Sequence, residues 1–127
     1  MDEETSKKST VQIGEEFEET VAALYTGLGY SVERNTDKSG QEIDLVISKR
    51  FAGMGTVKNA VECKHRVAGN VTNQEVFDFI NVFNSIRDIE GFSTGIIVTN
   101  AGFGLKAKKA AEKHKYIRLE TTCNLES

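Results

Sequence analysis

The stretch VKNAVECKH, residues 57–65, decides the fold expected for this chain. Its apolar run ends in an acid, a cysteine, a lysine and a histidine. Because side chains alternate between the two faces of a strand, Glu62 and Lys64 point to the same face and Cys63 points to the other. The pattern therefore predicts a strand with a polar pair at its end.

A second stretch, GQEIDLVI at residues 40–47, lies a short distance upstream and also predicts a strand. Gly53 and Gly55 lie between the two stretches and indicate a hairpin. If the strands pair antiparallel, Asp44 comes to lie beside Glu62. Two carboxylates and the ammonium group of Lys64 in one small volume suit a hard divalent cation and its bound water. The two strands together predict a metal site that carries chemistry.

Length and composition fit one globular domain. The chain has 127 residues, of which 39% are hydrophobic and 28% are charged, enough for a buried core and close to the globular average. No apolar run approaches the roughly 18 residues of a membrane span. The two cysteines, Cys63 and Cys123, form neither a disulfide framework nor a zinc pattern. Cys63 is interpreted as a small buried hydrophobe, and we expect a reducing, cytoplasmic location.

The net charge of −3 is unevenly distributed along the chain. Seven of the 19 acidic residues fall within residues 1–19, where Lys7 and Lys8 are the only basic residues. The rest of the chain carries fourteen basic and twelve acidic residues. A local basic face is therefore compatible with the sequence, although the overall charge does not indicate a nucleic-acid partner.

Three helices are expected from apolar periodicity. The first follows Thr10 and ends at Gly29, which suits a left-handed residue. The second is preceded by a capping box of Thr72 and Glu75. The third, at 105–115, is rich in lysine. The expected buried stripes are Ile13, Phe17, Val21, Leu24 and Leu28 in the first helix, and Val76, Phe79, Ile80, Phe83 and Ile86 in the second.

The remaining segments complete an αβββαβ core with one added helix and one added strand. Short strands are expected at 30–34, 43–48, 57–65, 94–99 and 116–119, with a turn-rich loop at 35–40. Residues 94–99 form a continuous apolar run, as expected for a strand that is covered on both faces. We therefore expect an α/β domain at 11–122 with a central mixed sheet flanked by helices. Residues 1–10 and 123–127 are expected to be tails.

Four segments also match a known pattern: GEEFE at 14–18, GQEID at 40–44, VECK at 61–64 and GIIVTNAGF at 95–103. Together they resemble the PD-(D/E)XK nuclease superfamily, and most closely the catalytic domain of Mrr-type restriction endonucleases. Holliday-junction resolvases are more distant relatives in this resemblance, which runs from about Val11 to Glu120. It implies a restriction-endonuclease-like core for the domain at 11–122. The acid-x-lysine core alone is common, and its conjunction with the other segments is specific.

The resemblance implies a catalytic set of Asp44, Glu62, Lys64, Glu18 and Gln74. Asp44 and Glu62 would bind Mg²⁺, or Mn²⁺ in its place, with the backbone carbonyl of Cys63 as a third oxygen. Lys64 would orient the attacking water, help it lose a proton or stabilise charge on the phosphate. Glu18 would be an accessory metal ligand, often acting through water. Gln74 stands where related nucleases often carry a glutamine, whereas Mrr-like proteins commonly have glutamine at the position of Glu62.

The resemblance further implies DNA as the substrate, with contacts expected at Lys106, Lys108, Lys109, Asn100 and His65. Simpler interpretations remain open at this point. Glu62 and Lys64 also fit an exposed ion pair worth under ~1 kcal/mol. Glu18 also fits, with its acidic neighbours, a set of charges that favour a helix start. A lysine-rich helix is usually a solvated face, and His65 and His114 also fit solvated or structural roles.

The first hypothesis is a Mg²⁺-dependent endodeoxyribonuclease that acts in defence against foreign DNA. An alternative is a nuclease that resolves Holliday junctions or acts in repair. A third hypothesis, outside the enzymes, is a nuclease-like DNA-binding module without catalysis. Cutting both strands requires two sites, so we expect a homodimer, or a partner or fused domain that supplies target recognition. No membrane association is expected.

Overall fold

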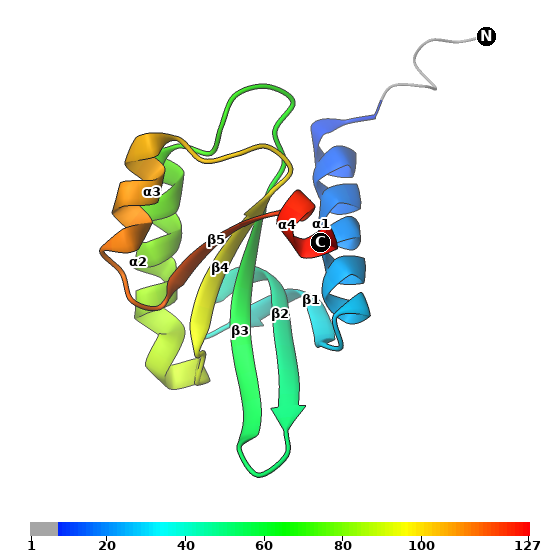
Figure 1. The fold of residues 1–127 in the computed structure, drawn as a ribbon, viewed down its shortest axis with the longest axis vertical. Coiled ribbons are helices and arrows are strands. Elements are labelled where there is room, and N and C mark those ends of the chain that lie inside the picture. Colours follow the sequence, from blue (N-terminus) through cyan, green and yellow to red (C-terminus); the bar gives the residue numbers. More distant parts are fainter. Residues whose placement is uncertain (1–7) are drawn as a thin grey trace, which may run out of the picture.

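The computed structural model describes residues 8–127, which form a five-stranded sheet with helices on both faces (Figure 1). The strands lie in the order β1-β2-β3-β4-β5. The first two pairings are antiparallel and the last two are parallel. In chain order the elements are α1 (Thr10–Gly27), β1 (Ser31–Lys38), β2 (Gln41–Phe51), β3 (Gly55–Lys64), α2 (Asn73–Glu90), β4 (Thr94–Thr99), α3 (Leu105–Glu112), β5 (Ile117–Thr121) and α4 (Thr122–Glu126). This mixed sheet confirms the expected α/β class.

Helix α2 covers one face of the sheet in the way the sequence predicts. All five residues of its expected stripe are buried, and the capping box of Thr72 and Glu75 is present. Gly95 of β4 lies directly beneath this helix. A Cβ atom added at Gly95 would come within 2.8 Å of the Phe83 ring, so a larger residue would force the helix away from the sheet. This close approach explains the glycine that opens the GIIVT segment.

Helix α1 covers the opposite face, and its expected stripe is partly wrong. Phe17 and Val21 are buried as predicted, but the third buried residue is Tyr25. Leu28 is 46% exposed. Residues 17, 21 and 25 follow one another at intervals of four and lie on one side of the helix. Leu28 is the C-cap residue, just past the last helical residue Gly27, so it no longer continues the buried stripe. The predicted end of the helix is confirmed, since Gly29 adopts a φ of +96°.

The expected loop at 35–40 is wrong because β1 continues to Lys38. The strand stays paired with β2 as far as Lys38↔Gln41, and the turn is confined to Ser39 and Gly40, which both have positive φ. Asn35 also has a positive φ, of 50°, inside the strand. Asparagine tolerates this conformation, so a turn-forming residue is accommodated without ending the strand.

The C-terminal residues differ from the expected tail at 123–127. They form α4, which is capped by the Thr121 side chain accepting from the Asn124 N–H at 3.2 Å. Leu125 packs against the apolar cluster beneath α1. Five residues are too few to show a helical period, so this helix could not be predicted from apolar spacing. Of the expected N-terminal tail, residues 1–7 lie outside the described part, and α1 begins after a Ser9 cap.

Smaller differences concern where elements end. β2 and β3 extend toward the hairpin beyond the expected strands, and α3 ends at Glu112 instead of residue 115. No helix within residues 8–127 is long and apolar enough to cross a membrane.

Candidate active site

The candidate site lies where β2 and β3 separate. Their pairing runs from the hairpin to Leu45↔Val61 and stops there. β3 continues beside β4 to Lys64↔Thr99, while β2 stays with β1 to Gln41. In the gap, the Asp44 carboxylate accepts a hydrogen bond from the Cys63 N–H at 2.9 Å. A side chain thus replaces the missing partner strand, and this fixes Asp44 against the end of β3.

Glu62 and Lys64 lie on one face of β3, as the alternation predicts. Their charged atoms are 3.4 Å apart, and both side chains are about three-quarters buried. Burial raises the pKa of Glu62 to about 7, with further contributions from the negative charge of Asp44 and from a hydrogen bond between the two carboxyl groups. Lys64 acts in the opposite direction and lowers this pKa. The pair is therefore not the exposed ion pair of the simpler interpretation. The structure brings together Asp44, Glu62 and Lys64.

Cys63 points to the other face of β3, also as predicted. Its free thiol is half-buried and packs against the apolar cluster beneath α1. Burial, with Asp44, Glu18 and Glu62 nearby, raises the pKa of the Cys63 thiol. A thiol held in its protonated form is a poor nucleophile, so the position agrees with a packing role.

Glu18 is set apart from the other acids of α1 by burial. One of its oxygens, Oε1, is buried without a hydrogen-bond partner, and Arg34 approaches that oxygen at 3.8 Å. Burial and the charge of Asp44 raise the pKa of Glu18, while Arg34 lowers it. Glu15, Glu16 and Glu19 are exposed on the same helix. Glu18 therefore lies within electrostatic reach of Asp44, on the α1 side of the gap.

The carboxylates of Asp44, Glu62 and Glu18 are suitable ligands for a hard divalent cation, although each is turned to a different partner. Within residues 8–127, no group of three or more histidine, cysteine or carboxylate side chains has the arrangement of a metal site. Asp44 is turned to the Cys63 N–H, Glu62 to Lys64 and Glu18 to Arg34. The Oε1 of Glu18, which accepts no hydrogen bond, and the crowded carboxylates of Asp44 and Glu62 would all be stabilised by a cation. Carboxylate oxygens are the ligands that Mg²⁺ prefers.

A small cavity of about 130 Å³ opens on the α2 side of the site. It contains three acidic residues outside the predicted catalytic set, Glu42, Glu75 and Asp78. Its lining consists of these residues with Glu62, Lys64, Ile43, Phe79 and Val82, and is called the acidic cavity below. The sequence predicts Glu75 as part of a helix cap, and Glu75 performs that role as well. Only the fold brings the first turns of α2 against the end of β3.

Gln74 does not line the acidic cavity. It is exposed, and its amide donates to the Asp78 carboxylate at 2.9 Å. Its connection to the expected catalytic set therefore runs through Asp78.

The loop after β3 is fixed by Asn100. The Asn100 side-chain oxygen accepts from the Arg66 N–H, and its amide donates to the Arg66 carbonyl, both at 2.8 Å. The Arg66 guanidinium donates to Glu75 and to the His65 carbonyl. The His65 ring packs edge-on against Phe17, with centroids 5.5 Å apart. Both polar ends of the Asn100 side chain are thus occupied by backbone groups, which indicates that Asn100 positions this loop.

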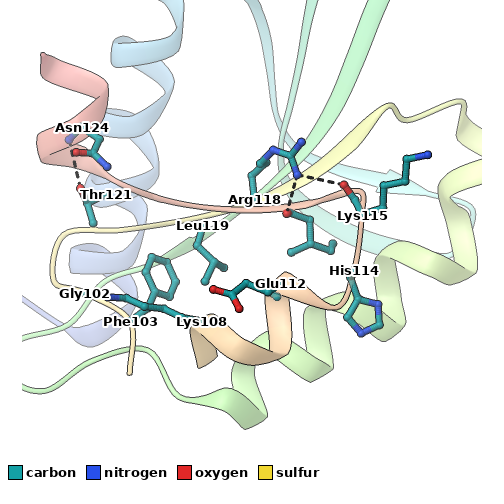
Figure 2. A pocket seen from close by; sticks show the side chains of 12 residues that line it. Gly102, Phe103, Lys108, Glu112, His114, Lys115, Arg118, Leu119, Thr121 and Asn124 are labelled. Carbon is teal, nitrogen blue, oxygen red and sulfur yellow. Dashed lines mark hydrogen bonds between the residues drawn. The ribbon is translucent and has the colours of Figure 1, made fainter. Parts of the chain in front are cut away.

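The three lysines expected to contact DNA are exposed on α3, toward the β5 edge of the sheet. Lys108 lines a second cavity of about 570 Å³ between α3, β5 and α4 (Figure 2). Figure 2 shows that the Arg118 guanidinium donates to two backbone carbonyls, those of Lys115 and Ile117. Glu112 also lines this cavity. The lining of this second cavity therefore carries charges of both signs, and it includes neither Asp44 nor Glu62.

Comparison with known families gives a match over most of the chain. The family model Mrr_cat, described as a restriction endonuclease, matches residues 11–126. No curated protein matches the chain in sequence.

Three solved structures share the fold. A protein of unknown function, AF1548, is 25% identical over 83% of this chain, with a TM-score of 0.69. The DNA modification-dependent restriction endonuclease AspBHI is 20% identical over 86%, with a TM-score of 0.60. A repair endonuclease from Pyrococcus abyssi is 18% identical over 91%, with a TM-score of 0.62. The chain spans 57%, 29% and 46% of these proteins, respectively. The sheet and helices described above thus form a restriction-endonuclease-like fold.

Proposed function

Because this chain belongs to the Mrr_cat family of restriction endonucleases, we propose that it is a Mg²⁺-dependent endodeoxyribonuclease that hydrolyses DNA phosphodiester bonds. One observation carries the proposal. The carboxylates of Asp44 and Glu62 meet Lys64 at the point where β2 separates from β3, and the pKa of Glu62 is raised to about 7 by burial and by Asp44. Such a perturbed, partly buried charge cluster is typical of a catalytic site.

Asp44 and Glu62 would hold the ion, with Mn²⁺ as a substitute for Mg²⁺. When bound, the ion supplies positive charge that favours proton loss from water and neutralises the phosphate. The Cys63 carbonyl is proposed as a third oxygen, because the N–H and C=O of a strand residue point to the same edge and the Cys63 N–H points to Asp44. Glu18, with one buried oxygen that accepts no hydrogen bond, would be the accessory ligand on the α1 side.

Lys64 would place its ammonium group beside the reacting phosphate. A positive charge already fixed where negative charge develops stabilises the transition state without reorganisation. Partial burial and the contact with Glu62 hold that ammonium group in place. Lys64 would also orient the attacking water, and Gln74 would act on the site only through Asp78.

DNA is the proposed substrate, and defence against foreign DNA in the cytoplasm is the proposed setting. Cutting both strands requires two sites, so we propose a homodimer, or a partner or fused domain that supplies target recognition. His65 is proposed to contact the DNA backbone, and the lysines of α3, Lys106, Lys108 and Lys109, are proposed to bind DNA by attraction over a longer distance. Asn100 is proposed to act by positioning the loop that follows β3.

The test is the nicking of supercoiled plasmid DNA in Mg²⁺, in Mn²⁺ and in EDTA. We expect cleavage in either metal and none in EDTA. Asp44→Asn removes a charge and should lower the rate at least about a hundredfold. Asp88→Asn makes the same chemical change at an exposed position of α2 and should leave the rate unchanged. Equal cleavage in EDTA, or full activity of Asp44→Asn, would refute the proposal.

A further inference from the structure

A groove of about 510 Å³ lies between the first turns of α1 and the loop that follows β3. We call it the basic groove. Its lining consists of Lys8, Thr10, Ile13, Gly14, Cys63, Lys64, His65, Arg66, Val67 and Ala68. Among the described residues, this lining contains two lysines, one arginine and one histidine but no carboxylate. In a chain with a net charge of −3, this is a local concentration of positive charge.

Lys64 belongs to both the basic groove and the acidic cavity. The two therefore meet at Lys64, the acidic cavity on its α2 side and the basic groove on its α1 side. A DNA strand carries one negative charge at every phosphate. When one phosphate lies beside Lys64, the carboxylates of the acidic cavity repel a neighbouring phosphate on that side, and the basic groove attracts the neighbour on the other side. The distribution of charge thus gives the strand a preferred direction away from Lys64.

The loop that forms one wall of the basic groove is held at both ends. At its start, Asn100 makes two hydrogen bonds of 2.8 Å with the backbone of Arg66. At its end, the Val71 N–H donates to the Gly102 carbonyl at 2.9 Å, and the Gly104 N–H donates to the Val71 carbonyl at 3.3 Å. This loop is thus already ordered before a ligand binds, which reduces the loss of conformational entropy on binding.

The side chains at the tip of this loop are apolar. Val67 is 91% exposed, and Ala68 follows it. Base edges are read mainly through directional hydrogen bonds, which neither side chain can make. The basic side chains, in contrast, suit phosphate oxygens. The composition of the basic groove therefore favours contact with the DNA backbone over the reading of bases.

Besides Lys64, two cations of the groove, Lys8 and Arg66, can reach a phosphate. Lys8 makes an exposed ion pair with Glu16, and such pairs are weak enough to exchange. A guanidinium group has five N–H donors. Two bonds occupy that of Arg66, to Glu75 and to the His65 carbonyl, so donors remain while Glu75 holds the group in place.

From these observations, and resting on the function proposed above, we propose that the basic groove binds the backbone of the cleaved strand on one side of the scissile phosphate. It does so irrespective of base sequence. The acidic cavity lies on the other side of Lys64 and receives no flanking phosphate. Recognition of a target sequence is then left to another part of the assembly.

The test measures binding of a fluorescein-labelled 20-base-pair duplex in EDTA by anisotropy, over a series of KCl concentrations. Each phosphate contact that is removed lowers the slope of log K against log salt by about 1. We expect this decrease for Lys8→Gln and for Arg66→Gln, by the same amount on duplexes of unrelated sequence. Arg50→Gln is the matched control, at an exposed position near the β2–β3 hairpin, at the opposite end of the sheet. It should keep the wild-type slope.

Thermal melting of each variant confirms that the fold is retained. Unchanged slopes in both folded groove variants, an effect confined to one DNA sequence, or absence of salt-dependent binding by the wild type would overturn the inference. Plasmid nicking separates this result from the function itself. Nicking by the wild type with unchanged slopes refutes the groove alone, whereas lowered slopes without nicking support the groove and refute the nuclease.

Discussion

The two sides of the end of β3 differ in charge, although one strand forms both. On the α2 side, Glu62 lines a cavity of about 130 Å³ together with Glu42, Glu75 and Asp78. On the α1 side, a groove of about 510 Å³ is lined by lysine, arginine and histidine, with no carboxylate among the described residues. Lys64 is common to both. Metal chemistry and backbone binding can therefore occupy adjacent volumes without sharing side chains other than this lysine.

This difference also explains why total charge is a poor guide to the partner of this chain. The chain carries a net charge of −3, and much of its acid either lies at the N-terminus or gathers in the acidic cavity. Electrostatic attraction of DNA depends on the field near the binding surface, which a local group of cations can dominate. The acidic cavity and the basic groove would cancel in any sum over the whole chain.

The largest expected effect comes from changing Lys64, the residue that both sides share. Lys64→Gln keeps a polar side chain, shorter by one bond, and removes its charge. We expect the cleavage rate in Mg²⁺ to fall about a hundredfold to a thousandfold, as for other groups that stabilise transition-state charge. Affinity for duplex DNA in EDTA should fall only a few-fold, because Lys8 and Arg66 remain in the groove. Single-turnover cleavage and anisotropy measure the two quantities.

The matched control is Lys113→Gln, at an exposed lysine just after α3, which should change neither quantity. If Lys64→Gln lowered binding and cleavage by the same factor, Lys64 would act only as an anchor of the backbone. Catalysis would then not distinguish the two sides of β3.

The next largest effect is on the free energy of unfolding, and it depends on Glu62 in the acidic cavity. The pKa of Glu62 is about 7 in the folded state, above its ordinary value near 4.5, because of burial and Asp44. Between these two values the folded state binds more protons than the unfolded state, so stability falls as pH rises through this window. Glu62→Gln removes this loss. In EDTA above pH 7, the variant should therefore be more stable than the wild type by up to about 3 kcal/mol.

Urea unfolding at pH 4, 6 and 8 measures this difference, which should disappear toward pH 4. Glu19→Gln, at an exposed position of α1, should follow the wild type throughout. A Glu62→Gln curve parallel to that of the wild type would mean that Glu62 is not strained by its neighbours. The same variant should lose cleavage, so stability and activity would change in opposite directions.

Some of this arrangement could be predicted from the sequence, because it depends on short-range periodicity. Alternation along β3 predicts that Glu62 and Lys64 share a face and that Cys63 faces the other way. The four-residue spacing in α2 predicts its buried stripe, and all five residues are buried. The hairpin glycines predict the antiparallel pairing of β2 and β3. Each of these inferences requires only that neighbouring residues follow one regular geometry.

The rest depends on contacts between distant segments. Glu75 and Asp78 reach the acidic cavity because α2 begins beside the end of β3, and Asn100 reaches Arg66 because two loops meet. The spacing of residues along the sequence indicates neither of these contacts. Tyr25 is not predicted because Leu24 and Leu28 continue the spacing from Val21, whereas in the structure Tyr25 packs into the cluster beneath α1 and Leu28 lies past the end of the helix. Gln74 is expected in the catalytic set only from the resemblance, and the contact of its amide with Asp78 has no signal in local spacing either.

A smaller effect is expected from changing Asn100, which holds the loop that forms one wall of the basic groove. Asn100→Ala removes the two hydrogen bonds that hold the backbone of Arg66. A loop that must be ordered on binding weakens affinity, so we expect KM for DNA to rise about fivefold to tenfold with little change in kcat. Asn84→Ala, at an exposed position of α2, is the control. A fall in kcat with unchanged KM would instead place Asn100 at the reacting atoms.

The smallest effect is expected on α3, and it decides how far the bound DNA extends from Lys64. Lys106, Lys108 and Lys109 are exposed and lie toward the β5 edge, beyond the acidic cavity. At that position they act on the DNA as distant charges. Replacing all three by glutamine should weaken binding about twofold at 20 mM KCl and leave it unchanged at 200 mM, where exposed charges beyond roughly 8 Å are screened. The Lys8→Gln and Arg66→Gln variants should instead remain weaker than wild type at both concentrations. If the α3 variant showed the larger loss at 200 mM, the duplex would cross α3, and the acidic cavity would lie beneath the DNA instead of beside it.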